Sequence, residues 1–362
     1  MQRSRQRVLA ALRRTGDGLV VYDALGGPAV GAVIDALDRR PRAVSDEAWR
    51  EYFRSGEVRY VSAGMRAEEA RFAEYLPDLP PGADVSCWGV GRIALQNAAG
   101  DHAGHKYWHP LAQIDSVAGL DAYPWPEVAA DGQEDLRARV ADLQAQGFAV
   151  VGNASQTILE TAYLMRGIDR LFLDFYERPE YVDALFTALA ERRIAEVRQL
   201  AATGVDAVRI GDDIATQQAL MISLPMYRER LRPWHAAVVA AAHETAPGLP
   251  IAYHSDGNLT ALLPELIEMG VTAINPVQPE CMDLAAIRRE FGRDLALWGC
   301  TPVQSIYAHG TPAQVRAHTR WLFEAIAPEH GLIVQFMNIV LTPHVLGSLR
   351  AFFEEFAACA GT

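Results

Sequence analysis

Short apolar runs alternate with segments of helical periodicity from residue 133 to the C-terminus. The apolar runs are bounded by Gly and Asp, which is typical of strands buried on both faces of a parallel sheet. The predicted strands are Phe148–Gly152, Val205–Gly211, Ile251–Tyr253, Val271–Ile274, Leu295–Gly299 and Leu332–Phe336. The predicted helices are Asp135–Gln146, Ile168–Phe175, Pro179–Thr203, Pro225–Thr245, Leu262–Met269, Leu284–Phe291, Pro312–Ile326 and Val345–Cys359. Six strand–helix units therefore follow one another.

The first 132 residues carry a less regular pattern. Apolar and basic residues alternate at helical spacing over Arg3–Arg14. They predict an amphipathic helix and not a secretory signal, because no apolar core region follows the basic residues. Gly18–Gly27 contains a predicted strand, and Val85–Leu95 is a second strand region. Helices are expected at Asp46–Phe53 and Met65–Tyr75.

Eight predicted strands that alternate with helices indicate an α/β protein with a (β/α)8 TIM barrel. We expect one domain over residues 1–362, with an N-terminal helical extension, because no boundary interrupts the alternation. A doubly wound sheet is the alternative, but no Gly-rich phosphate loop follows the first strand.

Small polar side chains follow most of the predicted strands. They are Asn153, Ser155, Asp212, Asp213, Gln217, His254, Asp256, Asn258, Asn275, Gln278, Cys300 and Asn338. In a (β/α)8 barrel the carboxyl ends of the strands meet at one mouth, so these groups are expected to converge there. Each one taken singly is also explained as a helix cap or a turn residue.

The stretch IAYHSDGN, Ile251–Asn258, carries the most specific chemistry. If the strand stays extended, His254 and Asp256 leave the same face, because side chains alternate along a strand. An imidazole and a carboxylate at a strand end suit proton transfer or a metal ion. The alternative is an Asx-type turn, in which Asp256 and Asn258 cap a helix that starts near Thr260.

Composition narrows the choice of partner. Half of the 362 residues are hydrophobic and the formal net charge is −12, with no basic stripe, so nucleic acid is not an expected partner. No apolar run approaches the roughly 20 residues that span a bilayer, so no membrane association is expected. The four cysteines are scattered without a CxxC spacing, which favours a reducing cytoplasm over a disulfide framework.

Several segments, in this order and spacing, resemble the uroporphyrinogen decarboxylase superfamily. They are HPLAQIDSVAGLDAYPWPEV, ILETAYLMRGIDRLFLDFYERPEYVDALF, IGDDIATQQALMISLPMYRERLRPWHAAVV, HSDGN, AINPVQPECMDL and LWGCTP. The resemblance covers most of the chain and is weakest over residues 1–85. It implies a (β/α)8 barrel. It also implies one of two activities: decarboxylation of a porphyrinogen, or methyl exchange with a corrinoid protein.

The resemblance favours the methyltransferase-like branch. The decarboxylases grip substrate carboxylates with an Arg-rich loop, whereas the corresponding stretch here is ALGGPAVGAV, without arginine. They also carry an Asp at the end of the second strand, and VSCWGVG has none. Uroporphyrinogen has eight carboxylates, so an acidic protein without gripping arginines is poorly suited to it.

In the zinc-dependent methyltransferases of this superfamily, a His-x-Cys and a later Cys hold the metal. Here the resemblance places His254 and Asp256 at the first motif and Asn338 near the second. Asp212, Asp213 or Cys300 would supply a further ligand. A hydrogen-bonded His–Asp pair without metal is the alternative.

We therefore expect an enzyme that transfers a methyl group between a small methylated substrate and a corrinoid protein or thiol acceptor. The expected catalytic residues are His254, Asp256, Asp212 and Asp213. The expected substrate-binding residues are Trp88, Asn153, Gln217, Asn258, Asn275, Gln278 and Asn338. Zinc and a partner-borne corrinoid are the expected cofactors, the cytoplasm the expected location, and a homodimer the expected assembly. A decarboxylase and a non-catalytic binding barrel are the alternatives.

Overall fold

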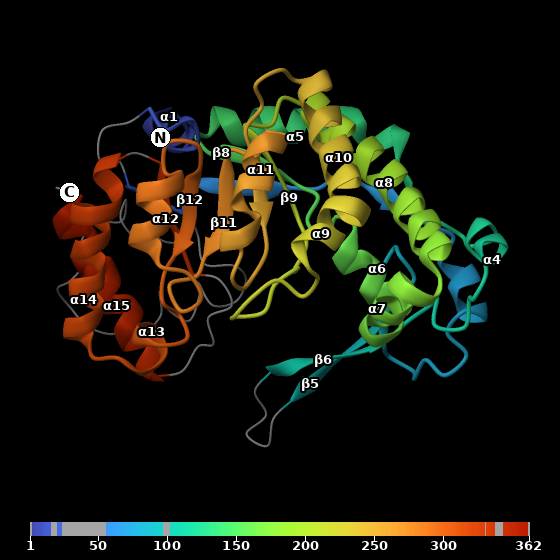
Figure 1. Cartoon of the computed structure of the whole chain (residues 1–362). Helices are drawn as coiled ribbons and strands as arrows, with labels where there is room; N and C mark the ends of the chain where they lie inside the picture. Colours follow the sequence, from blue (N-terminus) through green and yellow to red (C-terminus); the bar gives the residue numbers. More distant parts are fainter. Residues whose placement is uncertain are drawn as a thin grey trace.

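Eight parallel strands form the central sheet of the computed structural model (Figure 1). The structure describes residues 2–15, 20–23, 56–96, 102–329, 331–336 and 343–360. The strands are β1 (Val20–Tyr22), β2 (Val58–Val61), β8 (Ala149–Asn153), β9 (Ala207–Gly211), β10 (Ile251–His254), β11 (Ala273–Val277), β12 (Ala296–Cys300) and β13 (Leu332–Gln335). Their order is β1-β13-β12-β11-β10-β9-β8-β2, so the first strand pairs with the last and the rest follow the chain. This order confirms the predicted (β/α)8 barrel type.

Helices connect the strands and cover the outer face of the sheet, where their apolar sides form the larger hydrophobic core. The α-helices are α1 (Gln2–Arg13), α4 (Val117–Asp121), α5 (Gln133–Ala145), α6 (Leu159–Arg166), α7 (Ile168–Glu177), α8 (Pro179–Ala202), α9 (Leu224–Met226), α10 (Arg232–Thr245), α11 (Leu263–Met269), α12 (Leu284–Phe291), α13 (Ile306–His309), α14 (Pro312–Trp321) and α15 (Pro343–Cys359). Short 3-10 helices are η1 (Glu69–Glu74), η2 (Ala130–Gly132), η4 (Thr260–Leu262) and η6 (Ala327–Glu329), and Tyr227–Leu231 and Leu322–Ile326 are π-helical. The predicted helices after residue 133 and the six strands that alternate with them are confirmed.

The prediction for the second barrel strand was wrong. That strand is β2, which pairs in parallel with β8, whereas Val85–Leu95 contributes to a separate antiparallel sheet. The separate sheet consists of β4 (Asp84–Val85), β5 (Gly91–Gln96) and β6 (His102–Trp108). Pairing in register with β6 decides where β5 lies, and periodicity within one segment cannot reveal a partner.

The helix predicted at Met65–Tyr75 was also wrong at its start. Met65 and Arg66 form β3, which pairs antiparallel with β7 (Glu127–Val128), and only η1 is helical. Tertiary pairing has overridden local propensity here. The helix predicted at Asp46–Phe53 lies outside the described residues.

A second hydrophobic cluster fills the interior of the barrel. It takes at least one residue from each of the eight strands, and most of these residues are Ala or Val. Val8, Ala11 and Leu12 of α1 belong to the same cluster, so α1 seals the barrel at the ends where the strands begin. The Arg5 guanidinium donates to Asp206, just before β9, at 2.7 Å. The predicted N-terminal helix is therefore confirmed, and its apolar side closes the end of the barrel where the strands begin.

Among the described residues, no helix combines the length and the apolar character that crossing a bilayer requires.

Candidate active site

Polar side chains form the next layer of the barrel interior. They lie two residues beyond an apolar interior residue, within each strand or just after it. Examples are Asp23 after Val21 of β1, and His254 after Ala252 in β10. Side chains two apart share a face of a strand, so this layer stands directly above the apolar one, towards the carboxyl ends. Its members are Asp23, Tyr60, Asn153, Arg209, His254, Asn275, Trp298 and Gln335.

A chain of hydrogen bonds joins this layer and sets the tautomer of His254. Asp23 Oδ2 accepts from Gln335 Nε2 at 2.6 Å. Because a carboxylate only accepts, Gln335 must turn its Oε1 the other way, where it accepts from Asn275 Nδ2 at 2.8 Å. Asn275 Oδ1 then faces His254 Nδ1 at 2.8 Å, so Nδ1 carries the hydrogen. Nε2 of His254 is left with its lone pair available to a proton or a metal ion.

Two more donors fix Asp23 at the start of this chain. The Tyr60 hydroxyl donates to Asp23 Oδ2 at 2.6 Å and Trp298 Nε1 at 3.1 Å. Burial, and then the charge of Asp23, raise the pKa of Tyr60 far above its usual value, so the phenol keeps its proton. Asp23 itself is 1% exposed, and hydrogen bonds from Gln335, Tyr60 and Trp298 hold its carboxylate in place.

Asp213, His254 and Asp256 come together at the ends of β9 and β10. One ligand atom from each lies within 4.8 Å of the others. His254 Nε2 is 4.0 Å from Asp213 Oδ1, which also accepts from the Asp256 backbone N–H at 2.8 Å. One imidazole nitrogen and two carboxylate oxygens suit zinc, and the fixed Nδ1–H is the outer-sphere arrangement that metal-bound histidines use. The described residues therefore fit a metal ion.

The electrostatic surroundings keep His254 neutral. Burial, and then the positive charge of Arg209, lower the pKa of His254, against the opposing effect of Asp213. Arg209 is held inside the barrel by a 3.1 Å hydrogen bond to Asn153 Oδ1, and its guanidinium lies 4.7 Å from the Tyr60 ring centroid. A neutral imidazole is the form that binds metal.

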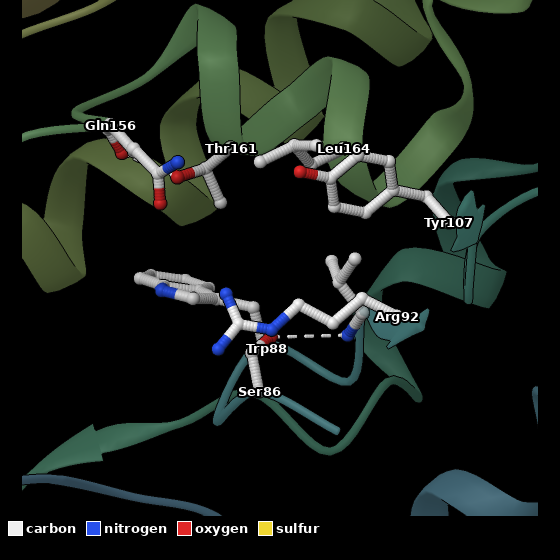
Figure 2. A pocket seen from close by; sticks show the side chains of 8 residues that line it. Ser86, Trp88, Arg92, Tyr107, Gln156, Thr161 and Leu164 are labelled. Carbon is white, nitrogen blue, oxygen red and sulfur yellow. Dashed lines mark hydrogen bonds between the residues drawn. The ribbon is translucent and has the colours of Figure 1, made fainter. Parts of the chain in front are cut away.

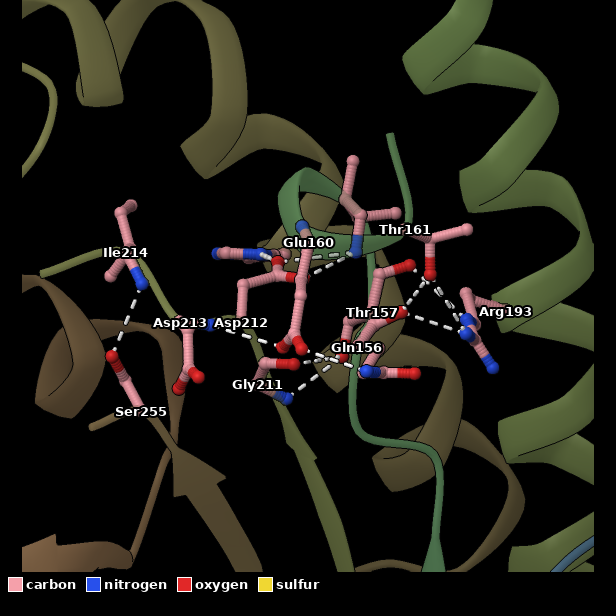
Figure 3. A network of polar contacts seen from close by, with 12 residues as sticks. Gln156, Thr157, Glu160, Thr161, Arg193, Gly211, Asp212, Asp213, Ile214 and Ser255 are labelled. Carbon is pink, nitrogen blue, oxygen red and sulfur yellow. Dashed lines mark hydrogen bonds and ion pairs between the residues drawn. The ribbon is translucent and has the colours of Figure 1, made fainter. Parts of the chain in front are cut away.

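Glu160, near the start of α6, adds a third carboxylate beside Asp213, as Figure 3 shows. Its Oε2 accepts from the Asp213 backbone N–H at 3.2 Å and its Oε1 from Gln156 Nε2 at 2.7 Å. Burial, and then the charges of Asp213 and Asp212, raise the pKa of Glu160 to about 8. A carboxyl group that keeps its proton near neutral pH is suited to general acid catalysis.

Asp212 does not face the mouth of the barrel. It is fully buried, and its carboxylate accepts from the backbone N–H groups of Ile158 and Glu160 at 2.9 and 3.0 Å. His235 Nε2 lies 2.7 Å from Asp212 Oδ2, and Tyr227 closes the chain at 3.2 Å. Burial by itself would raise the pKa of Asp212. The hydrogen bond from His235 lowers it, and the net effect is a pKa below the usual value. The geometry makes Asp212 the anchor of the α6 N-terminus.

The other predicted residues fall into two groups. Asn153, Asn275 and Gln278 are bound within the site region: the Ser155 hydroxyl donates to Asn153 Oδ1 at 3.0 Å, and the Gly257 backbone N–H to Gln278 Oε1 at 2.6 Å.

The residues of the second group are not members of the Asp213–His254–Asp256 cluster. Asn258 accepts from the Thr260 backbone N–H at 3.1 Å in an Asx-type turn, and Gln217 is exposed and donates to Gln304 at 2.5 Å. Cys300 is fully buried and is not part of the cluster among the described residues. Trp88 lines a separate pocket beside α6. Asn338 and the stretch ALGGPAVGAV lie outside the described residues.

Sequence reasoning missed the contributions of Asp23, Tyr60, Gln335 and Glu160. A signal for the first three existed: an apolar residue followed two positions later by a polar one, repeated in strand after strand. Glu160 carried no such signal. It lies on a helix after a loop, and only the fold brings it beside β9.

The fold and the site define a (β/α)8 barrel with an acid–imidazole cluster at the carboxyl ends of its strands. A family model described as "Uroporphyrinogen decarboxylase (URO-D)" matches residues 130–357. The chain belongs to this family of enzymes.

Individual relatives are distant. Uroporphyrinogen decarboxylase 2, chloroplastic, from Arabidopsis thaliana is 29% identical over 124 residues, which are 34% of this chain and 30% of that protein. The match therefore spans under a third of the relative's length.

Among solved structures, a methyltransferase from Methanosarcina mazei aligns over 98% of both chains with a TM-score of 0.60 and 12% identity, and it shares the fold. A B12-independent methionine synthase from Shewanella sp. W3-18-1 aligns over 93% of this chain and 89% of that one, with a TM-score of 0.41 and 15% identity, which is too distant to establish a shared fold.

Proposed function

We propose that this protein transfers a methyl group between a small methylated substrate and a corrinoid protein or thiol acceptor. The observation that carries the proposal is the cluster of Asp213, His254 and Asp256, whose ligand atoms lie within 4.8 Å of one another. The full-length likeness in fold to a methyltransferase supports it. A cytoplasmic location, a homodimer and a single domain over residues 1–362 stay predictions.

Each residue has a role in this proposal. Asp213, His254 and Asp256 would hold zinc, which supplies Lewis-acid chemistry and lowers the pKa of a bound thiol. Asn275 orients the His254 ring through Nδ1. Glu160 lies beside the cluster, where its carboxyl group can give a proton to the heteroatom that loses the methyl group.

A decarboxylase is the second candidate. Two observations favour it: the sequence match to a uroporphyrinogen decarboxylase, and Glu160, a carboxyl group that can donate a proton near neutral pH. Decarboxylation also needs cationic groups that bind the substrate carboxylates, and Arg209 is the one arginine in the described polar layer of the barrel.

The test of function is methyl transfer from methylated substrates to free reduced cobalamin, followed by the absorbance of methylcobalamin. Asp256→Asn keeps the shape of the side chain and removes its charge, so we expect it to lower the rate about a hundredfold or more. Glu290→Gln, at an exposed position of α12, is the control and keeps the rate. Decarboxylation without any methyl transfer would replace this proposal by the second candidate.

The metal is tested separately, by elemental analysis of purified protein. We expect about one zinc per chain, because three protein ligands are what an open zinc site provides. His254→Ala should lose the zinc, whereas His309→Ala, at an exposed histidine, should keep it. Zinc retained in His254→Ala would exclude this site as the place where the metal binds.

A further inference from the structure

A pocket opens between the three-stranded antiparallel sheet and α6, apart from the barrel interior. It holds about 430 Å³ of empty space, part of it open to solvent. Its lining residues are Ser86, Trp88, Val90, Arg92, Tyr107, Gln156, Thr161 and Leu164. Figure 2 shows two facing walls, with Trp88 and Arg92 on one side and Tyr107 and Leu164 on the other.

The Trp88 ring is a rigid wall. Trp88 is 7% exposed, and its backbone carbonyl accepts from the Tyr123 hydroxyl at 2.7 Å. The Arg193 guanidinium lies 4.7 Å from the ring centroid and is itself bound to the Thr157 and Gln156 carbonyls at 3.1 and 2.7 Å. An indole fixed in this way, across the pocket from the wall that carries Tyr107, suits a flat aromatic group.

The pocket carries a single positive charge. Of the eight lining residues, Arg92 alone is charged. Its side chain is 53% exposed, and the carboxylate that pairs with it among the described residues is that of Asp84, 81% exposed and 3.9 Å away. An ion pair that is this exposed and this long contributes little to stability. The guanidinium N–H groups of Arg92 can therefore bind an anion instead.

Hydrogen bonds link one wall of the pocket to the carboxylate cluster. Gln156 lines the pocket and donates to Glu160 Oε1 at 2.7 Å. Glu160 in turn contacts the backbone of Asp213, one of the three cluster residues. Gln156 therefore contacts both the pocket that holds Arg92 and the carboxyl group of Glu160.

We propose that this pocket binds an aromatic carboxylate. The ring lies between Trp88 and the wall of Tyr107 and Leu164, and the carboxylate binds Arg92. The far end of the ring points along Gln156 towards Glu160. That this end carries the methylated heteroatom rests on the proposed function; the binding of the aromatic carboxylate does not.

Titration calorimetry with two probes of the same shape tests the binding. The probes are 4-methoxybenzoate and its neutral analogue 4-methoxybenzyl alcohol. We expect the protein to bind the carboxylate about tenfold more tightly than the alcohol, because a charge-assisted hydrogen bond to arginine is available to the anion alone. Arg92→Gln should abolish this preference. Arg71→Gln, at an arginine half exposed outside the pocket, should keep it.

A second variant tests the ring. Tyr107→Ser should weaken the binding of both probes by a similar factor and leave the preference for the carboxylate, because it removes a wall and no charge. Tyr107 is 36% exposed, so this change should not affect folding. Equal affinity for the two probes, an undiminished preference in Arg92→Gln, or no binding of either probe would overturn the proposal.

The binding result separates this proposal from the proposed function. Binding of 4-methoxybenzoate with no methyl transfer from any substrate keeps the aromatic-carboxylate pocket and removes the methyltransferase. Methyl transfer from small aliphatic compounds without binding of the aromatic probes keeps the methyltransferase and removes the pocket.

Discussion

At the scale of single residues, burial separates the groups that can react from those that cannot. Cys300 was expected among the metal ligands, yet it is fully buried, and burial raises the pKa of its thiol to about 12. A thiol ligates zinc as the thiolate, so a group that keeps its proton up to about pH 12 is a poor ligand. The half-exposed carboxylate of Asp213 takes part in the cluster instead.

Cys300 should therefore resist alkylation. In the native protein at pH 8 we expect iodoacetamide to modify the partly exposed Cys281 and Cys359 much faster than Cys300, because thiolate and access are both needed. Mass spectrometry of the labelled peptides measures the three rates, and denatured protein, in which all three react alike, is the control. Rapid labelling of Cys300 that zinc prevents would restore this thiol as a ligand.

At the scale of elements, the end of one strand anchors the start of a helix. Asp212 follows β9 and accepts hydrogen bonds from backbone N–H groups at the start of α6, which carries Glu160. The four first N–H groups of a helix need acceptors, and a carboxylate there also complements the helix dipole. Neighbouring residues on one strand end thus have different roles: Asp212 positions α6 and Asp213 faces the cluster.

A matched pair of substitutions separates these roles. Asp212→Ala leaves His235 and several buried N–H groups without their acceptor, so we expect it to lower the free energy of unfolding by about 3 kcal/mol or more. Asp213→Ala should cost about 1 kcal/mol or less, because its side chain is 36% exposed, but should lose the zinc. Thermal unfolding of chelator-treated protein measures the first effect and elemental analysis the second. The reverse pattern would make Asp212 the functional residue.

At the scale of the whole molecule, the negative charge of the protein disfavours substrates that carry many carboxylates. The net charge is −12, and Asp23, Asp213 and Asp256 add carboxylates around the barrel mouth, opposed in the described polar layer by Arg209. Eight substrate carboxylates would meet this acidic interior with little compensation.

We therefore expect no measurable conversion of uroporphyrinogen to coproporphyrinogen, assayed anaerobically by product fluorescence. A uroporphyrinogen decarboxylase assayed in parallel provides the positive control. Turnover at ordinary enzyme concentration would show that the decarboxylase is the correct branch.

The sequence by itself predicted the barrel and placed His254 and Asp256 together at the end of one of its strands. Apolar runs and helical segments alternate clearly after residue 133. Strands of a parallel barrel are buried on both faces, so nearly all their residues are apolar and the runs can be recognised in the sequence. His254 and Asp256 were identified for the same local reason: they follow directly on such a strand.

Tertiary structure decided the remainder, because it depends on which segments become neighbours. The pattern of Val85–Leu95 predicts a barrel strand, but pairing with β6 places it in a separate sheet. Glu160 has no pattern that indicates a site residue, and it lies beside β9 because α6 is anchored there. Asp212 and Asp213 are adjacent carboxylates in the sequence, and only the fold sends one to a helix end and the other to the cluster. The tautomer of His254 depends on Asp23, 231 positions earlier in the chain, through two amides that no local pattern connects. Periodicity records which face of a segment is buried; it holds no information about what lies opposite that face.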